Sequence, residues 1–337
     1  MNLRNRRTAI AAGCGMVFLI LDGKTALDGA VEGINLCLNT LIPSLYPFIL
    51  LSILLTGALT GQAVPFLRPA ASLCKIPKGT ESLLVMGFFG GYPVGARSTA
   101  QMYRTGQLSR IHAARMICIC NNAGPSFIFG ILGSMFSRAF VPWVLWAIHI
   151  FSALLTGMAL PGDSIRTTVT PASGQTRLTE ALEQAVKVMA SLCGWVVLMR
   201  MVLAFLDRWI LWMLPPAAQI GLSGILELAN GCVRLQQIDS EALRFIIASG
   251  MLSFGGICVM FQTASVSDGI PMTLYFPGKL LNCSISILIS AFAVPFCFPG
   301  QPVHYTFAAF AAVLGGICLC AFCFSKKSSR IPAVIGV

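Results

Sequence analysis

Two hydrophobic segments of this chain have membrane-spanning character but are interrupted by residues that a continuous helix does not tolerate. The first interruption falls at Gly90–Gly95 and contains Pro93, and the second is the run Asn121-Asn122-Ala123-Gly124-Pro125-Ser126. Glycine leaves the backbone loose and proline removes an amide donor, so both helices are predicted to break there. Such breaks persist in lipid only where they are buried in protein or line a wet cavity. The two breaks predict a substrate site built from half-helices.

The composition excludes a soluble protein. Hydrophobic residues make up 56% of the 337 residues, charged residues only 10%, and the mean hydropathy is +0.80, whereas a soluble domain carries about 25% charged residues. The net charge of +11 is spread over short loops and termini, a pattern typical of contact with anionic headgroups and not of nucleic-acid binding. We therefore expect an all-α polytopic integral membrane protein with membrane lipid as a partner and no nucleic acid.

The order of the segments divides the chain into five regions. Three arginines, Arg4, Arg6 and Arg7, precede a short apolar run without a small-residue cleavage site, which predicts a signal anchor. Residues 161–178 are rich in Pro, Gly, Ser and Thr and form a linker. The predicted regions are a signal-anchor helix (1–22), a first repeat (23–160), the linker (161–178), a second repeat (179–270), and C-terminal helices with a basic tail (271–337), in which Pro271–Leu281 is expected at the membrane interface.

The region after the linker resembles the region before it. Ala181-Leu-Glu-Gln-Ala-Val186 echoes Ala26-Leu-Asp-Gly-Ala-Val31, and both open an amphipathic helix that leads into a span; in the first half these are 24–40 and Leu41–Thr60. Broken helices at corresponding places indicate a transporter core of two inverted repeats with re-entrant hairpins. The alternative is chance agreement between apolar helices. The residues assigned to helix breaks are Gly90, Gly91, Pro93, Gly95, Gly124 and Pro125 in the first half, and Gly231 and Gly250 in the second.

The distribution of basic residues predicts that both termini are cytoplasmic. Lys326, Lys327 and Arg330 anchor the C-terminal end on that side. Inverted repeats then place four arginines on the far side, against the positive-inside rule: Arg104, Arg110, Arg115 and Arg138. Either these arginines serve the site, or the segment that carries them is re-entrant.

The first half supplies candidate anion-binding residues. Arg97 follows the first break within one turn, where it is either an interfacial anchor or a partner for a carboxylate of a small anionic substrate. Asn121 and Asn122 either cap a half-helix or lie at an anion site formed by its exposed amides. Thr99 and Ser126 are further candidates beside the two breaks.

The second half supplies a carboxylate. Glu227 lies four residues before Gly231 in an apolar segment, so it is expected either to pair with an arginine such as Arg234 or to couple to a cation or proton. Asn230 and Ser253 complete this half of the candidate site. Arg200 lies within an apolar span and needs a partner, either Glu227 or Asp207.

No residue pattern indicates catalysis, a metal or a cofactor. The 13 cysteines lie mostly in apolar segments, and the densest cluster, Cys318-Leu-Cys320-Ala-Phe-Cys323, reads as small apolar filler. His149 in an apolar span is expected to be a hydrogen-bonded helix contact. Motifs for hydrolases, ATPases and dinucleotide enzymes are missing from the sequence, so we predict no enzyme, and uphill transport would need an ion gradient or a partner.

The sequence Gly91-Tyr-Pro-Val-Gly-Ala-Arg97, followed by a polar helix and Asn121-Asn122-x-Gly-Pro-Ser126, resembles the YlbJ-type sporulation integral membrane proteins. These belong to the nucleoside-recognition or Gate superfamily, which has relatives among concentrative nucleoside transporters. Leu41-Ile-Pro-Ser-Leu-Tyr-Pro-Phe48 and Gly278-Lys-Leu-Leu281 are also similar to that family, so the likeness covers about residues 25–282.

The resemblance implies a bacterial membrane protein of sporulation, located in the outer forespore membrane, that moves dipicolinic acid from the mother cell to the forespore. In the nucleoside-transporting relatives both repeats carry acidic residues near the breaks. Tyr92-Pro93-Val94 stands there in the first repeat of this chain, which favours an anionic substrate over a nucleoside. The alternatives are a nucleoside or ion transporter of the same superfamily and a non-transporting structural protein of the spore envelope.

Overall fold

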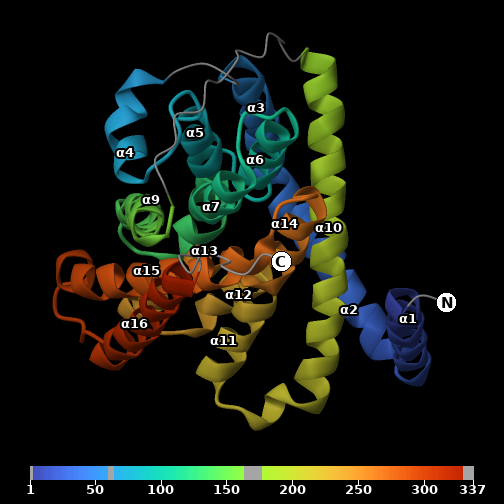
Figure 1. Cartoon of the computed structure of the whole chain (residues 1–337). Helices are drawn as coiled ribbons and strands as arrows, with labels where there is room; N and C mark the ends of the chain where they lie inside the picture. The colour runs from blue at the N-terminus through green and yellow to red at the C-terminus, as the bar shows by residue number, and fades with distance from the viewer. Residues whose placement is uncertain (1–2, 60–63, 163–176, 329–337) are drawn as a thin grey trace.

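The computed structural model describes residues 3–59, 64–162 and 177–328, and these residues form helices joined by short connections, with no strand among them (Figure 1). Within these described residues, seven helical segments are long and apolar enough to cross a membrane: Gly23–Leu59, Arg110–Met135, Val141–Ala159, Leu178–Trp209, Glu241–Val266, Met272–Cys297 and Tyr305–Phe322. Large apolar side chains such as Phe292 and Phe296 are exposed on the outside, as expected where lipid is the solvent. The predicted all-α, polytopic membrane architecture is confirmed.

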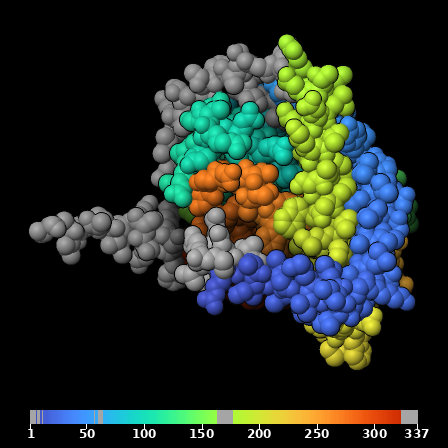
Figure 2. Space-filling view, turned by 90° about the vertical axis from the view of Figure 1, so that its right-hand side faces the viewer, coloured from blue at the N-terminus to red at the C-terminus, as the bar shows by residue number. Residues whose placement is uncertain are grey.

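Two long helices run side by side and form one flank of the molecule. α2 (Gly23–Leu36) continues through a π-helical turn (Cys37–Leu41) into α3 (Ile42–Leu59), and α10 (Leu178–Trp209) packs along this rod (Figures 1 and 2). The direction is antiparallel, because Gly29 lies against Met201 and Ala204 and Gly33 lies against Val197. α1 (Leu3–Leu21) lies at the edge of this flank.

The predicted amphipathic helix over 24–40 leads directly into the span that begins at Leu41. The two are one continuous rod, because the amide of Ile42 donates to the carbonyl of Cys37 and the wider π turn carries the helix past Pro43. The rod places Leu41 and Leu45 in the interior of the protein.

In the part of the chain that the structure describes, four helices are broken. The first break (residues 90–93) separates α5 (Ser82–Phe89) from α6 (Val94–Arg104), and the second break (residues 121–124) separates α7 (Arg110–Cys120) from α8 (Pro125–Phe127), which continues as helical turns to Met135. The third break (Glu227) separates α11 (Pro216–Leu226) from α12 (Leu228–Arg234), and the fourth break (Gly255) separates α13 (Glu241–Phe254) from α14 (Gly256–Val266).

Unbroken helices complete the fold. α9 (Val141–Ala159) packs against α7, α13 and α15 (Tyr275–Cys297), and α15 also packs against α13 and α16 (Tyr305–Ser328). α4 (Arg68–Leu73) lies near the start of α5. On both sides of residues 163–176 the chain therefore runs through a long helix, two broken helices and an unbroken helix in the same order. This order agrees with the predicted repeat, whereas the inverted relation between the halves stays a prediction, as do the domain boundaries. Residues 163–176 of the predicted linker and Arg330 lie outside the described residues.

The breaks of the first half lie where the sequence predicts them, but two positions of the second half do not. Gly90 ends α5, Gly91 and Pro93 lie between the half-helices, and Gly124 and Pro125 begin α8, while Gly95 is already the second residue of α6. The assignments of Gly231 and Gly250 are wrong. Gly231 lies inside α12, where a Cβ atom would stand 2.2 Å from the Cα atom of Gly224, and Gly250 lies inside α13, where a Cβ atom would stand 2.9 Å from Ile287. Both glycines permit close helix packing instead.

Candidate functional site

The helix breaks meet in the centre of the protein. A Cβ atom on Gly91, whose φ is +72°, would lie 3.0 Å from the amide nitrogen of Gly124, so the first and second breaks are in direct contact. The hydroxyl of Tyr92 in the first break donates to the carbonyl of Leu252 at 3.0 Å. Gly255 of the fourth break adopts φ +83°, and a Cβ atom there would lie 2.8 Å from the Tyr92 hydroxyl. Only glycine allows both the backbone conformation and this contact.

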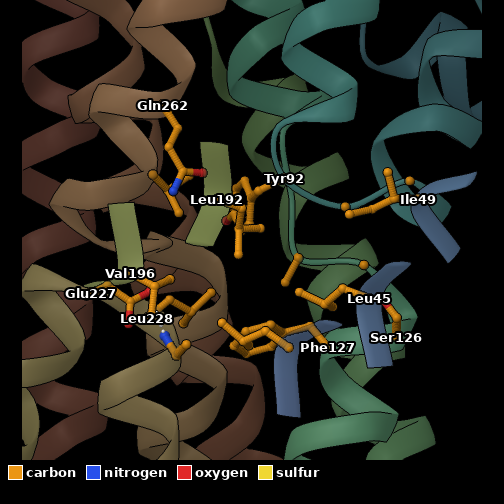
Figure 3. Close-up of a pocket in the computed structure, with 17 residues that line it drawn as sticks. Leu45, Ile49, Tyr92, Ser126, Phe127, Leu192, Val196, Glu227, Leu228 and Gln262 are labelled. Carbon is orange, nitrogen blue, oxygen red and sulfur yellow. Dashed lines mark hydrogen bonds between the residues drawn. The ribbon is translucent and has the colours of Figure 1, made fainter. Parts of the chain in front are cut away.

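A small cavity lies beside this junction, between the breaks and the α3–α10 flank (Figure 3). Its volume is about 50 Å³, which holds a few water molecules. Figure 3 shows Glu227 and Gln262 on one side, Leu45 and Ile49 on the other, and Tyr92 between them. The lining residues are Leu41, Leu45, Ile49, Gly90, Gly91, Tyr92, Ala123, Gly124, Ser126, Phe127, Leu192, Val196, Glu227, Leu228, Ala229, Val259 and Gln262. The first three breaks all contribute to this lining, so the cavity is the candidate substrate site.

Glu227 is the acidic residue of the cavity and caps α12. Its carboxylate accepts hydrogen bonds from the amides of Ala229 at 2.9 Å and Asn230 at 2.7 Å, and from the side-chain amide of Asn230 at 2.8 Å. The positive end of the α12 dipole thus faces a carboxylate. The residue is 4% exposed. The expected pairing with Arg234 is wrong, because Arg234 binds Asp207.

Arg97 lies next to the cavity but does not line it. The half-buried side chain on α6 borders a separate small space with Gln262 and Leu192, two residues that also line the cavity. No carboxylate forms an ion pair with Arg97 in the parts of the chain that the structure covers. The guanidinium is therefore one layer of side chains away from the cavity.

Asn121 and Asn122 belong to a buried polar network behind the second break. The side-chain amide of Asn121 donates to the hydroxyls of Thr263 at 2.7 Å and Tyr275 at 2.8 Å. The ammonium of Lys279 donates to the carbonyl of Asn121 at 2.5 Å and to the side-chain oxygen of Asn122 at 3.1 Å. The asparagines thus bind other helices and do not line the cavity.

His149 joins the second break to the fourth. Its Nε2 atom accepts the amide of Ala123 at 3.1 Å, and its Nδ1 atom lies 3.1 Å from the hydroxyl of Ser253. Asn282 of α15 donates to the carbonyl of Ser253 at 3.3 Å. The prediction that His149 is a hydrogen-bonded helix contact is confirmed, and Ser253 is bound within the same network.

The remaining candidates are distributed over the same region. Thr99 is buried and donates to the carbonyl of Gly95 at 2.8 Å, so it serves its own helix. Ser126 lines the cavity, and Asn230 reaches the cavity only through Glu227. The sequence reasoning did not assign functions to Tyr92, Gln262 or Lys279. Each of the three carries a polar group in an apolar segment, which is the only feature that could have pointed to it. The residues that each one contacts are distant in sequence.

Arg200, Asp207, Arg234 and Glu32 form a cluster of ion pairs. Asp207 of α10 accepts from Arg234 of α12 at 3.0 Å and from Arg200 at 3.2 Å, and Arg200 also pairs with Glu32 of α2. Of the two partners expected for Arg200, Asp207 is confirmed and Glu227 is not. The four residues line an outer cavity of about 660 Å³ that also reaches Asn230. Asn230 therefore lies between the outer cavity and Glu227 of the inner one.

Arg115 has a structural role. It is 1% exposed and donates to the carbonyls of Cys74 at 3.0 Å, Gly157 at 3.1 Å and Lys75 at 3.3 Å. Its guanidinium thus holds α7 against α9 and the end of α4. Arg115 does not line the cavity.

The described residues contain no group of three or more His, Cys, Asp or Glu side chains arranged to hold a metal ion. The cysteines on which the structure reports are free thiols, most of them buried among apolar side chains. The absence of a cofactor and of catalysis stays a prediction.

Comparison with curated proteins finds 24% identity over 335 aligned residues, 84% of this chain and 81% of the relative, with the sporulation integral membrane protein YlbJ of Bacillus subtilis (strain 168). The resemblance to the YlbJ-type sporulation membrane proteins is confirmed. No protein-family profile matches the chain. No solved structure matches it either. The relative is named as an integral membrane protein and not as an enzyme, and the seven apolar helices of this chain agree with that location.

Proposed function

We propose that this chain is a sporulation-associated membrane transporter that moves dipicolinic acid across the outer forespore membrane. The observation that carries the transport proposal is the meeting of broken helices at a small cavity lined by three of the breaks. Half-helices that converge on a cavity form the substrate sites of many secondary transporters. The similarity to a sporulation membrane protein supports the biological setting.

Two cavities separated by one hydrogen-bonded pair support a gated path. The inner cavity has a volume of about 50 Å³ and the outer one about 660 Å³. Glu227 lines the inner cavity, Asn230 lines the outer one, and their side chains are joined at 2.8 Å. Movement of α12 would break this contact and connect the two spaces. We assign Glu227 the role of gating or coupling.

An aromatic dicarboxylate is too large for a cavity of about 50 Å³, so binding requires the half-helices to separate. Arg97 borders the adjacent space across Gln262 and Leu192. A cavity that widens past these two side chains reaches the guanidinium, which is suited to bind a carboxylate with two parallel hydrogen bonds. Arg97 is thus the proposed anion-binding residue of the open site.

The experiment compares dipicolinic acid in spores and mother cells of a deletion strain complemented with wild type, Arg97→Ala or Arg138→Ala. Arg138 is exposed and does not line the cavity, so Arg138→Ala is the matched control. Deletion and Arg97→Ala are expected to leave dipicolinic acid in the mother cell, at membrane levels of protein that immunoblotting shows to be normal. Normal loading of spores in the deletion strain would contradict the proposed substrate.

Glu227 favours a second candidate function, transport of a nucleoside or a cation. A carboxylate that faces the cavity suits ribose hydroxyls or a positive charge better than an anion. Binding of dipicolinic acid, a nucleoside and Na⁺ by the purified protein separates these substrates. A structural protein of the spore envelope would bind none of them, and its Arg97→Ala and Glu227→Ala variants would act as wild type.

A further inference from the structure

Lys279 is a buried cation that the proposed path does not use. It lies in α15 with an exposed fraction of 0%. Its ammonium donates to the carbonyl of Asn121 at 2.5 Å and the side-chain oxygen of Asn122 at 3.1 Å. Among the residues described, no carboxylate forms an ion pair with it. A buried charge without an opposite charge is unfavourable unless oxygen atoms surround it.

The groups around Lys279 are those that hold a cation. Asn121 follows the last residue of α7, so its carbonyl belongs to the negative end of a helix dipole. Two residues next to these contacts in the chain, Asn121 itself and Asn282 one turn after Lys279 on α15, each have a buried side-chain oxygen that accepts no hydrogen bond from the described residues. The rings of Tyr92 and Tyr275 present their faces to the ammonium, at 5.4 Å and 5.8 Å from the ring centres, which stabilises a positive charge.

Neutral oxygen ligands at the end of a half-helix are the usual ligands of an exchangeable alkali cation in secondary transporters. We propose that the second break contains a monovalent-cation site and that the ammonium of Lys279 occupies it in place of an alkali ion. A cation fixed to the chain holds the second break, the first break through Tyr92, and α15 together. As a statement about coupling, the inference rests on the proposed transport function: no alkali cation exchanges at this site, and any coupling ion binds elsewhere.

The test compares melting temperatures of the purified protein in NaCl, KCl and choline chloride at equal ionic strength. Wild type is expected to gain less from NaCl or KCl, relative to choline chloride, than Lys279→Ala does, because its site is already occupied. Lys279→Ala is expected to melt lower than wild type in choline chloride and to regain part of the loss in NaCl or KCl. Lys187→Ala, which removes an exposed lysine of α10, is expected to melt as wild type in every salt.

Two results would overturn the inference. One is an alkali-specific rise in melting temperature that is as large in wild type as in Lys279→Ala, since this shows that Lys279 does not occupy a cation site. The other is a Lys279→Ala protein with the same melting temperature in all three salts. If Lys279→Ala does not fold, Lys279→Gln keeps most of the volume without the charge and carries the same comparison. No substrate enters this measurement, so failure of dipicolinic acid loading leaves its outcome unaffected, and the reverse also holds.

Discussion

At the scale of single residues, Glu227 combines two tasks in one carboxylate. It stabilises the start of α12 with three hydrogen bonds and also faces the inner cavity. The two tasks make different demands, since capping requires only acceptor oxygens and coupling requires a charge that can change. Substitutions at this position therefore separate the structural contribution from the functional one.

Glu227→Ala is expected to destabilise the protein by about 1–3 kcal/mol, because two amides and the Asn230 side chain lose their acceptor in a buried place. Glu227→Gln keeps one acceptor oxygen and is expected to be more stable than Glu227→Ala, yet to lose transport if the charge couples or gates. The measurements are thermal unfolding followed by tryptophan fluorescence and dipicolinic acid loading. Ser240→Ala, at the less buried cap of α13, is the control; equal losses for Ser240→Ala and Glu227→Ala would contradict the prediction.

At the scale of elements, the half-helices are in contact backbone to backbone. A Cβ atom on Gly95 in α6 would lie 1.7 Å from the carbonyl oxygen of Cys120 in α7, and one on Gly87 in α5 would lie 2.3 Å from it. The two half-helices that flank the first break, α5 and α6, therefore both lie in close contact with the carbonyl of Cys120. This contact places the end of α7, and with it the second break, against the first.

Gly95→Ala is expected to destabilise the protein by at least about 3 kcal/mol, because the clash is with rigid backbone and forces α6 and α7 apart. The matched control is Gly221→Ala in α11, where a Cβ atom meets nothing within 4 Å. This control is expected to be neutral or to stabilise by up to about 1 kcal/mol, since alanine is the better helix former. Thermal unfolding of both purified variants checks this, and a Gly95→Ala protein as stable as Gly221→Ala would show that α6 and α7 are less closely packed.

At the scale of the whole molecule, the ion-pair cluster joins helices from both halves of the chain. Glu32 comes from α2, Arg200 and Asp207 come from α10, and Arg234 comes from α12. The side chains of Asp207 and Arg234 are 29% and 17% exposed, so solvent screens the pair only in part. The cluster holds α12, the proposed gate, against α2 and α10.

A double-mutant cycle with Asp207→Asn and Arg234→Gln is expected to give a coupling free energy of about 0.5–2 kcal/mol in unfolding. The coupling arises because Arg234 binds both oxygens of the Asp207 carboxylate. Arg68 and Glu81 form an ion pair outside α12, with 2.8 Å between the guanidinium nitrogen and the carboxylate oxygen. A double-mutant cycle on this pair is the control, and it is expected to leave dipicolinic acid loading unchanged. Additive effects of the two substitutions at Asp207 and Arg234 would show that the pair does not act as a unit.

The sequence by itself determined the properties that depend on local chemistry. Hydropathy identified a membrane protein, because the transfer of a segment into lipid depends on its own composition. Glycine and proline identified the first and second breaks, because a missing Cβ atom or amide acts on the backbone at that position. The same reasoning placed a carboxylate at the third break and found the resemblance to sporulation membrane proteins.

Only the tertiary structure decided what depends on distant partners. Gly250 and Gly255 lie in one short run of the sequence. Gly255 has a positive φ, lies against Tyr92 and forms the break, whereas Gly250 stays helical and lies against Ile287. Lys279 belongs to a segment with the composition of a membrane interface, yet it is 0% exposed because α15 passes the end of α7, whose oxygens receive its charge. Burial and electrostatic partners are properties of the assembled helices, and no local pattern contains them.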